Sequence, residues 1–146
     1  MRLLPKTSTY ALRAVLYLTS AEPEQKFVPI KQISDNLNLS FHFLTKLFQI
    51  LSKHGLVISC RGPAGGVSLA KSARDISIRD IIFALEGADF FEKCILLLPN
   101  CSDDQPCPFH EYWIKMREDL KNMFTETSLD ELGRKIKNQG LRLVAT

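Results

Sequence analysis

The stretch LSFHFLTKLFQILSKHGLVISCRGPAGGVSLA, residues 39–70, decides the fold of this chain. Its first part predicts a helix from Ser40 to about His54, because serine is a favourable N-cap and Gly55 supplies a C-terminal stop. Apolar residues gather on one face of that helix and polar residues on the other. The apolar face holds Leu44, Leu47, Phe48 and Leu51, and the polar face holds His42, Thr45, Lys46, Gln49 and Lys53.

Two short strand-like runs follow, at residues 56–59 and 67–70, on either side of the sequence CRGPAGG. Gly62, Gly65 and their neighbours allow positive φ angles without bulk, so this segment predicts the tip of a hairpin. No Gly-Lys-Ser/Thr follows, so the glycines do not form a nucleotide-phosphate loop. Arg61 lies at the base of the tip. A slim basic hairpin after a polar-faced helix is typical of a wing that enters the minor groove of DNA.

Upstream, the pattern predicts a helix over about residues 8–20, with Thr7 or Ser8 as its cap, and a short helix that opens at Val28-Pro29. Asn38 tolerates the left-handed conformation that a tight turn between helices needs. A short helix, a tight turn and a longer helix with an exposed polar face predict a helix-turn-helix. An ordinary helical hairpin is the alternative, and the wing favours the DNA-binding interpretation.

Downstream, apolar spacing predicts a fourth helix from Ser77 to Glu86, ending at Gly87, and a long helix that begins near Phe109. The long helix carries an apolar and aromatic stripe formed by Phe109, Tyr112, Trp113, Met116, Leu120, Met123 and Phe124. Such a stripe indicates a dimer interface, and packing back onto the chain's own core is the alternative. A final short helix follows, capped by Thr127-Ser128 with Glu131 as the partner.

The fold class expected is mainly α with a small β-hairpin wing: a winged helix-turn-helix plus a long C-terminal dimerisation helix. We expect a DNA-binding domain over residues 1–87, a cysteine-containing cofactor loop over 88–108, and a dimerisation helix with a tail over 109–146. Residues 1–79 carry 11 Lys/Arg against 4 Asp/Glu, and the remainder 8 against 12. A basic half joined to an acidic half is typical of a nucleic-acid-binding head on a non-binding body. No apolar run reaches the roughly 18 residues of a membrane span, so we expect a cytoplasmic protein without a membrane partner.

The segment CILLLPNCSDDQPCPFH, residues 94–110, holds three cysteines and one histidine: Cys94, Cys101, Cys107 and His110. Soft or borderline ligands at this density indicate a metal site, since cysteines in a reducing cytosol are more often ligands or redox groups than disulfides. Zinc accepts the same ligand set, although zinc sites use close pairs that this segment lacks. Cys60 stands apart, and we expect a small semi-buried residue there.

In their order and spacing, these motifs resemble the Rrf2 family of bacterial winged-helix transcription factors. The resemblance rests on the helix core LSFHFLTKLFQILSKHGLV, the RGPAGG wing and the three cysteines after the fourth helix, and it covers nearly the whole chain. It implies a homodimer that binds a two-fold-related operator in double-stranded DNA. Carried over by position, the DNA contacts are Ser40, His42, Thr45 and Lys46 on the helix, with Arg61, Gly62 and Gly65 in the wing. One branch carries a glutamate in place of Thr45, so the operator sequence does not carry over.

In the sensing branch of the family, three cysteines and one other residue hold an iron–sulfur cluster. The resemblance therefore implies that Cys94, Cys101 and Cys107 hold a cluster, of the 2Fe–2S type. One group of members takes a histidine three residues after the last cysteine, which matches His110. Another takes an aspartate from the N-terminus of the other subunit, where this chain has Ser8, a poor ligand. Six residues separate the first two cysteines, one more than in the histidine group, and such clusters are easily lost in air.

The function expected is that of a transcriptional regulator whose affinity for its operator follows the state of this cluster, and thus redox, nitric oxide or iron status. A regulator of the same fold with zinc, with a thiol switch or without a cluster is the alternative. A small metal-dependent redox enzyme is the alternative from a different functional class. The chain has no Cys-x-x-Cys pair, no acid–base constellation and no nucleotide loop, so we do not expect an enzyme.

Overall fold

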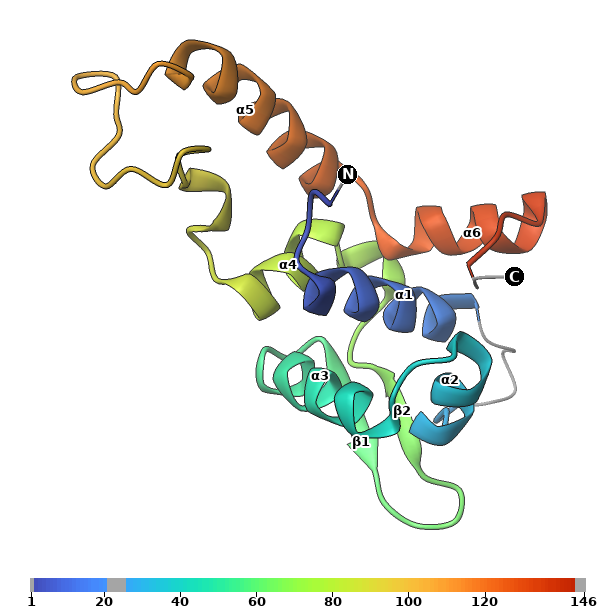
Figure 1. Cartoon of the computed structure of the whole chain (residues 1–146). Coiled ribbons are helices and arrows are strands. Elements are labelled where there is room, and N and C mark those ends of the chain that lie inside the picture. The colour runs from blue at the N-terminus through green and yellow to red at the C-terminus, as the bar shows by residue number, and fades with distance from the viewer. Residues whose placement is uncertain (1, 21–25, 144–146) are drawn as a thin grey trace.

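The computed structural model describes residues 2–20 and 26–143, and their architecture confirms the expected fold class (Figure 1). Helices account for most of these residues, and the strands form one antiparallel hairpin. In chain order the elements are α1 (Lys6–Ser20), α2 (Ile30–Leu37), α3 (Phe41–Lys53), β1 (Val57–Cys60), β2 (Gly66–Leu69), the 3-10 turn η1 (Ala73–Asp75), α4 (Ile78–Glu86), the 3-10 turn η2 (Phe90–Glu92), α5 (His110–Glu126) and α6 (Leu129–Gln139). Among these helices, none is long and apolar enough to cross a membrane.

The turn between α2 and α3 has the conformation that the sequence predicts. Asn38 adopts φ 54°, in the left-handed region, and its backbone N–H donates to the Ser34 carbonyl. The Ser40 hydroxyl accepts a hydrogen bond of 3.3 Å from the backbone N–H of Phe43 and so caps α3. The apolar face of α3 then packs into a core shared with α1, α2, α4 and the hairpin. Its fully buried members include Val15, Ile33, Leu44, Leu51, Val57, Val67, Ile81 and Ile82.

Each strand of the wing is displaced by one residue, toward the tip, from the range expected from the sequence. Cys60 pairs with Gly66, and Val57 pairs with Leu69, so the tip comprises residues 61–65. The shift follows from Gly66, which adopts φ 156° and lies so close to the Val28 carbonyl that no Cβ would fit. Val28 in turn exchanges two backbone hydrogen bonds of 2.9 Å with Val67. The segment before α2 therefore fixes the base of the wing to the head, the name used here for α1–α4 and the hairpin.

Helix α1 begins before the residues expected to cap it. Its first residue is Lys6, and the N–H of Thr9 donates to the Pro5 carbonyl, so Thr7 and Ser8 lie inside the first turn. Instead of capping α1, both hydroxyls donate to the Glu86 carboxylate at the end of α4, at 3.3 and 2.8 Å. The cap predicted at Thr7 or Ser8 is therefore wrong. At α2 the difference is one residue, because Pro29 is the N-cap rather than the first helical residue.

The two C-terminal helices behave differently. Helix α5 projects from the head, whereas α6 lies along α1 (Figure 1). Leu129 at the start of α6 is fully buried, and a Cβ on Gly133 would overlap the Thr19 side chain, so α6 packs closely on α1. The Ser128 hydroxyl accepts from the Glu131 N–H at 3.1 Å, which confirms the predicted cap.

The segment between η2 and α5, residues 93–109, is here called the cysteine loop.

Candidate metal centre and nucleic-acid interface

The cysteine loop folds so that three thiols meet. The Sγ atoms of Cys94, Cys101 and Cys107 all lie within 4.8 Å of one another, and none of the three takes part in a disulfide. Cys94 lies two residues after the end of η2, and Cys107 lies three residues before the start of α5. Leu97 and Asn100 adopt φ values of 55° and 59°, so the chain reverses between the first two cysteines. The ligands that the sequence spaces over seventeen residues thus converge on one point.

The donor atoms fall into two close pairs. The Sγ atoms of Cys94 and Cys107 are 3.5 Å apart, and the Sγ of Cys101 lies 3.4 Å from Nδ1 of His110. Metal–sulfur and metal–nitrogen bonds of about 2.0–2.3 Å in a tetrahedron separate neighbouring donors by about 3.3–3.8 Å. Both pairs have this separation. His110 lies at the edge of the thiol group, on the side of Cys101.

The electrostatic environment differs between Cys94 and Cys101. The backbone N–H of Leu98, assisted by that of Leu96 and by the neighbouring thiols, lowers the pKa of Cys94 to about 7 against the opposing effect of burial. At Cys101 the N–H of Cys107 also stabilises the thiolate, but desolvation and the two adjacent thiols prevail and raise its pKa. Cys94 therefore presents a thiolate, the form that binds metals, more readily than Cys101 does.

Helix α5 holds the start of the cysteine loop. The indole N–H of Trp113 donates to the Lys93 carbonyl at 2.9 Å, and the Arg117 guanidinium donates to the Glu92 carbonyl at 3.0 Å. The Lys121 ammonium, 2.9 Å from the Glu92 carboxylate, lowers the pKa of that carboxyl. These contacts fix the backbone immediately before Cys94 to the dimerisation helix expected from the sequence.

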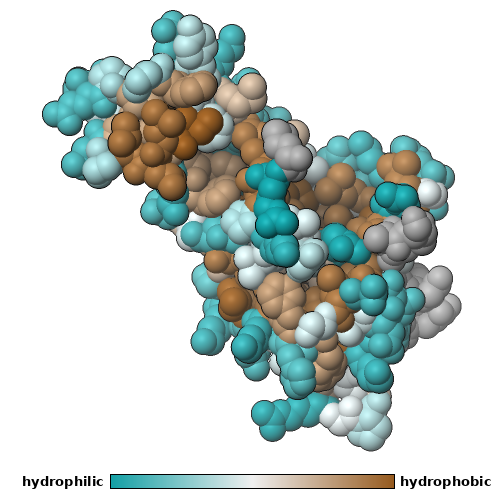
Figure 2. Space-filling model, viewed as in Figure 1, coloured by the Kyte–Doolittle hydropathy of each residue, from teal (hydrophilic) through white to brown (hydrophobic). Residues whose placement is uncertain are grey.

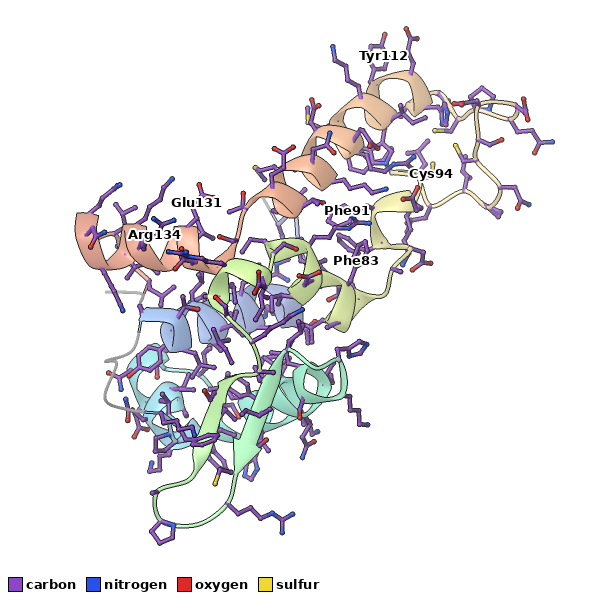
Figure 3. The ribbon with its side chains drawn as sticks, turned by 180° about the vertical axis from the view of Figure 1, so that it is seen from behind. Phe83, Phe91, Cys94, Tyr112, Glu131 and Arg134 are labelled. Carbon is purple, nitrogen blue, oxygen red and sulfur yellow. The ribbon has the colours of Figure 1, made fainter. Side chains whose placement is uncertain are left out.

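An aromatic group ties η2 to both flanking helices. The ring of Phe91 lies 5.8 Å from that of Phe83 on α4 and 5.7 Å from that of Phe124 on α5. Figure 3 shows Phe83 and Phe91 together beneath Cys94. Because Phe91 is buried between these two rings, η2 is packed closely against both α4 and α5.

The stripe expected on α5 divides into two faces. Trp113, Leu120 and Phe124 line a cavity of about 210 Å³ together with η2 and the start of the cysteine loop. Phe109, Tyr112, Met116 and Met123 are instead exposed, and Tyr112 points away from the chain at the far end of α5 (Figure 3). Figure 2 shows an apolar area over the same end of the molecule, where Ile95, Leu96, Leu97 and Leu98 are exposed. Packing on the chain's own core and an outward apolar face thus coexist on one helix.

Sequence reasoning missed one neighbour of the candidate metal ligands and misjudged the exposure of Cys60. Asp103 Oδ1 lies 2.8 Å from His110 Nε2, and the only signal for it is an acidic pair inside the cysteine segment. Cys60 is exposed on β1, which makes the expectation of a semi-buried residue wrong. Ser8 is fully buried, bonded to Glu86, and so is unavailable as a ligand.

The residues expected to contact DNA lie at the opposite end of the molecule from the cysteine loop (Figure 1). On α3, Ser40, His42 and Lys46 are exposed, while the half-buried Thr45 donates its hydroxyl to the Phe41 carbonyl at 2.8 Å. In the wing, Arg61 and Gly62 are exposed. Gly65 is half-buried, and a Cβ there would overlap the Cys60 carbonyl, so it shapes the tip. The helix and the wing together present a polar, basic surface.

Comparisons with known proteins agree with this arrangement. A family profile described as Rrf2, iron-dependent transcriptional regulator, matches residues 4–135. A helix-turn-helix transcriptional regulator of Aquifex aeolicus is 36% identical over 128 residues, which cover 86% of this chain and 88% of the relative. The regulator IscR of Photorhabdus laumondii is 33% identical over 145 residues, which cover 99% of this chain and 85% of that protein.

Solved structures show the same similarity. The structure of CymR, the global cysteine regulator of B. subtilis, superposes with a TM-score of 0.76 at 29% identity, covering 91% of this chain and 97% of CymR. The structure of T. potens IscR superposes with a TM-score of 0.75 at 26% identity, covering 97% of this chain and 93% of that one. The similarity thus extends over the head, the cysteine loop and the C-terminal helices.

Proposed function

Because this chain belongs to the Rrf2 family of transcriptional regulators, we propose that it is a homodimeric DNA-binding protein whose operator affinity is set by an iron–sulfur cluster. Its relatives and its fold are those of DNA-binding regulators rather than of enzymes. The observation that carries the proposal is the convergence of three thiols within 4.8 Å in a loop attached to α5.

The residues present fit a 2Fe–2S cluster. Thiolates with one imidazole form an accepted ligand set for such a cluster. Cys94, Cys101 and Cys107 would supply the thiolates, and His110, beside Cys101, would supply the imidazole. When bound, the cluster supplies a redox centre that oxidants, nitric oxide or iron shortage convert or remove. A single zinc ion is the second candidate, because three close thiols and one imidazole also fit a tetrahedral site.

We propose that the surface of α3 and the wing contact the two grooves of double-stranded DNA. Ser40, His42, Thr45 and Lys46 are positioned for the major groove, and Arg61 with the glycines of the tip for the minor groove. Two copies related by a two-fold axis then bind a two-fold-related operator. In this division residues 1–87 form the DNA-binding domain, 88–108 the cofactor loop, and 109–146 the dimerisation segment.

The chain's own contacts suggest how the cysteine loop reaches the heads. Its first residue, Lys93, is held by Trp113, and its last residues lead directly into α5. At the end of α4, Glu86 is held by Ser8 of α1, so the head is firmly joined to the segment before the loop. A change in the order of the cysteine loop therefore changes the angle between head and α5, and with it the spacing of the two α3 helices. A coupling free energy of about 1–3 kcal/mol corresponds to a change of roughly 5–150-fold in operator affinity.

The test is anaerobic purification of the wild type and Cys107→Ala, with quantification of iron and acid-labile sulfide and an absorption spectrum. Cys60→Ala is the matched control, because it removes an exposed thiol outside the cysteine loop. We expect equal iron and sulfide with visible charge-transfer bands in the wild type and the control, and neither in Cys107→Ala. A colourless wild type with one zinc per chain supports the second candidate.

The DNA arm uses duplexes selected from a random library by the loaded and the cluster-free protein. Fluorescence anisotropy then gives the affinity of both forms for each selected duplex at several salt concentrations. We expect at least one duplex whose affinity differs between the forms by a factor within the range given above. Equal affinity of both forms for every selected duplex contradicts control by the cluster, while leaving DNA binding itself intact.

A further inference from the structure

We propose that Asp103 is a positioning residue that holds His110 in the tautomer whose Nδ1 binds the metal. This inference rests on the proposed metal centre and assigns a binding atom and a supporting residue within it. The arrangement is a chain of three groups: the Asp103 carboxylate, the His110 imidazole and the Cys101 thiol. Its two contacts are 2.8 Å, from Oδ1 to Nε2, and 3.4 Å, from Nδ1 to Sγ.

The donor–acceptor chemistry fixes which nitrogen is free. An ionised carboxylate only accepts hydrogen bonds, so Nε2 of His110 carries the proton that points at Asp103. A neutral imidazole has one N–H and one lone pair, which leaves the lone pair on Nδ1. Nδ1 is the nitrogen next to Cys101, on the side where the thiols converge. The atom that can bind a metal thus faces the metal centre.

The backbone of His110 is fixed, but its ring needs a further support. His110 is the first residue of α5, and its N–H donates to the Cys107 carbonyl at 3.0 Å. This contact sets the position of the Cα atom and leaves rotation of the side chain undetermined. The hydrogen bond to Asp103 is the contact that orients the ring, because its other polar contact within residues 2–20 and 26–143 is the candidate ligand Cys101 itself.

A tight turn presents Asp103 rather than its neighbour. The backbone N–H of Ser102 donates to the Gln105 carbonyl at 3.3 Å, and the Gln105 N–H donates to the Ser102 carbonyl at 3.2 Å and to its hydroxyl at 3.2 Å. The turn directs Asp103 to His110, while the Asp104 carboxylate has no hydrogen bond or ion pair with the described part of the chain. Asp104 is therefore a matched control with the same charge, one residue away.

Burial argues for orientation rather than stability as the role of Asp103. Its side chain is 89% exposed, whereas that of His110 is 14% exposed. An ion pair or hydrogen bond at such an exposed carboxylate adds little to folding stability. Carboxylates that accept from a ligating histidine nevertheless fix its ring and tautomer, and their removal typically weakens metal binding about 10–100-fold.

The experiment titrates ¹¹³Cd²⁺ into the reduced, metal-free full-length protein, labelled with ¹⁵N at histidine. Long-range ¹H–¹⁵N spectra identify the ligating nitrogen, because only the nitrogen bonded to the ion shows a ¹¹³Cd–¹⁵N coupling. We expect the coupling on Nδ1 of His110. Coupling on Nε2, or none to His110, overturns the proposal. Iron and sulfide in the anaerobic wild type are a separate readout, so failure of the proposed cluster and failure of this inference are distinguishable.

Competition with a chromophoric chelator gives the Cd²⁺ affinity of the variants. We expect Asp103→Ala to weaken binding about 10–100-fold, Asp103→Asn to weaken it less because its amide oxygen still accepts, and Asp104→Ala to leave it within twofold. In a His110→Ala background, Asp103→Ala should cause no further loss, since Asp103 acts through that ring. An Asp103→Ala protein with wild-type affinity, or an equal loss in the His110→Ala background, would falsify the assignment.

Discussion

Ser8 shows how a single hydroxyl supports the junction between α1 and α4. It is fully buried and donates at 2.8 Å to the Glu86 carboxylate, which Thr7 also reaches. Glu86 is the last residue of α4, where the helix dipole disfavours negative charge, so the carboxylate depends on these hydroxyls. We predict that Ser8→Ala lowers the free energy of unfolding by about 1.5–3 kcal/mol, the range for a hydrogen bond to a charged group.

Urea denaturation followed by circular dichroism measures this change. Ser52→Ala is the control, because Ser52 is exposed in α3 and gains the same helix propensity without losing a side-chain hydrogen bond. A loss at Ser8 no larger than that at Ser52 contradicts the stated role. A Glu86→Gln background should reduce the effect of Ser8→Ala, since a hydrogen bond to a neutral amide oxygen is weaker than one to a carboxylate.

At the scale of the element, two glycines of the wing are required for different reasons. Gly62 has φ 105° with open space around its Cα, whereas Gly66 has φ 156° and contacts the Val28 carbonyl. A side chain at Gly62 thus meets backbone strain alone, at a cost of about 1–2 kcal/mol. We predict that Gly66→Ala destabilises the protein more than Gly62→Ala, because it also displaces the segment before α2. Thermal unfolding of both variants checks this order, and the reverse order contradicts it.

Helix α5 offers a second prediction at this scale. Trp113→Phe keeps an aromatic ring against η2 but removes the N–H that donates to the Lys93 carbonyl. A hydrogen bond contributes about 0.5–1.5 kcal/mol, so amide hydrogen exchange of residues 93–98 should become roughly two- to tenfold faster. Tyr112→Phe is the control, because Tyr112 is 71% exposed and points away from the chain. If amide hydrogen exchange of residues 93–98 is unchanged in Trp113→Phe, this hydrogen bond does not hold the cysteine loop and has no part in its proposed coupling to the DNA-binding end.

Helix ends are predicted better from the sequence than the contacts that helices and loops make. Caps and stops such as Ser40, Gly55 and Ser128 act through neighbouring backbone groups, so local sequence predicts them well. The apolar stripe of α5 predicts a helix but not which of its residues are covered, because Trp113 and Met116 share the spacing, yet Trp113 lines the cavity beside η2 and Met116 is exposed. The three cysteines are recognisable by type and spacing, whereas the contact of Asp103 with His110 depends on a turn in an irregular loop.

At the scale of the whole molecule, the two candidate sites lie far apart and share no residue. The wing and α3 occupy one end, and the cysteine loop with the outer half of α5 occupies the other (Figure 1). One set of contacts between them runs through α4, η2 and α5, which meet at Phe83, Phe91 and Phe124. A second copy bound along α5 would convert a small change at this junction into a change in the distance between two DNA-binding ends.

The exposed face of α5 supplies the test at this scale. Tyr112, Met116 and Met123 are exposed along it, and a stable dimer needs such an apolar area to bury. We predict that Met116→Glu dissociates the dimer, because it places an unpaired charge in the proposed interface. Sedimentation velocity should show a monomer. Operator affinity should fall about 10²–10⁴-fold, because the two half-sites no longer bind as one unit. Asn138→Glu, the same charge at an exposed position of α6, should leave both unchanged. A dimeric Met116→Glu protein with wild-type operator affinity places the interface elsewhere than on this face of α5.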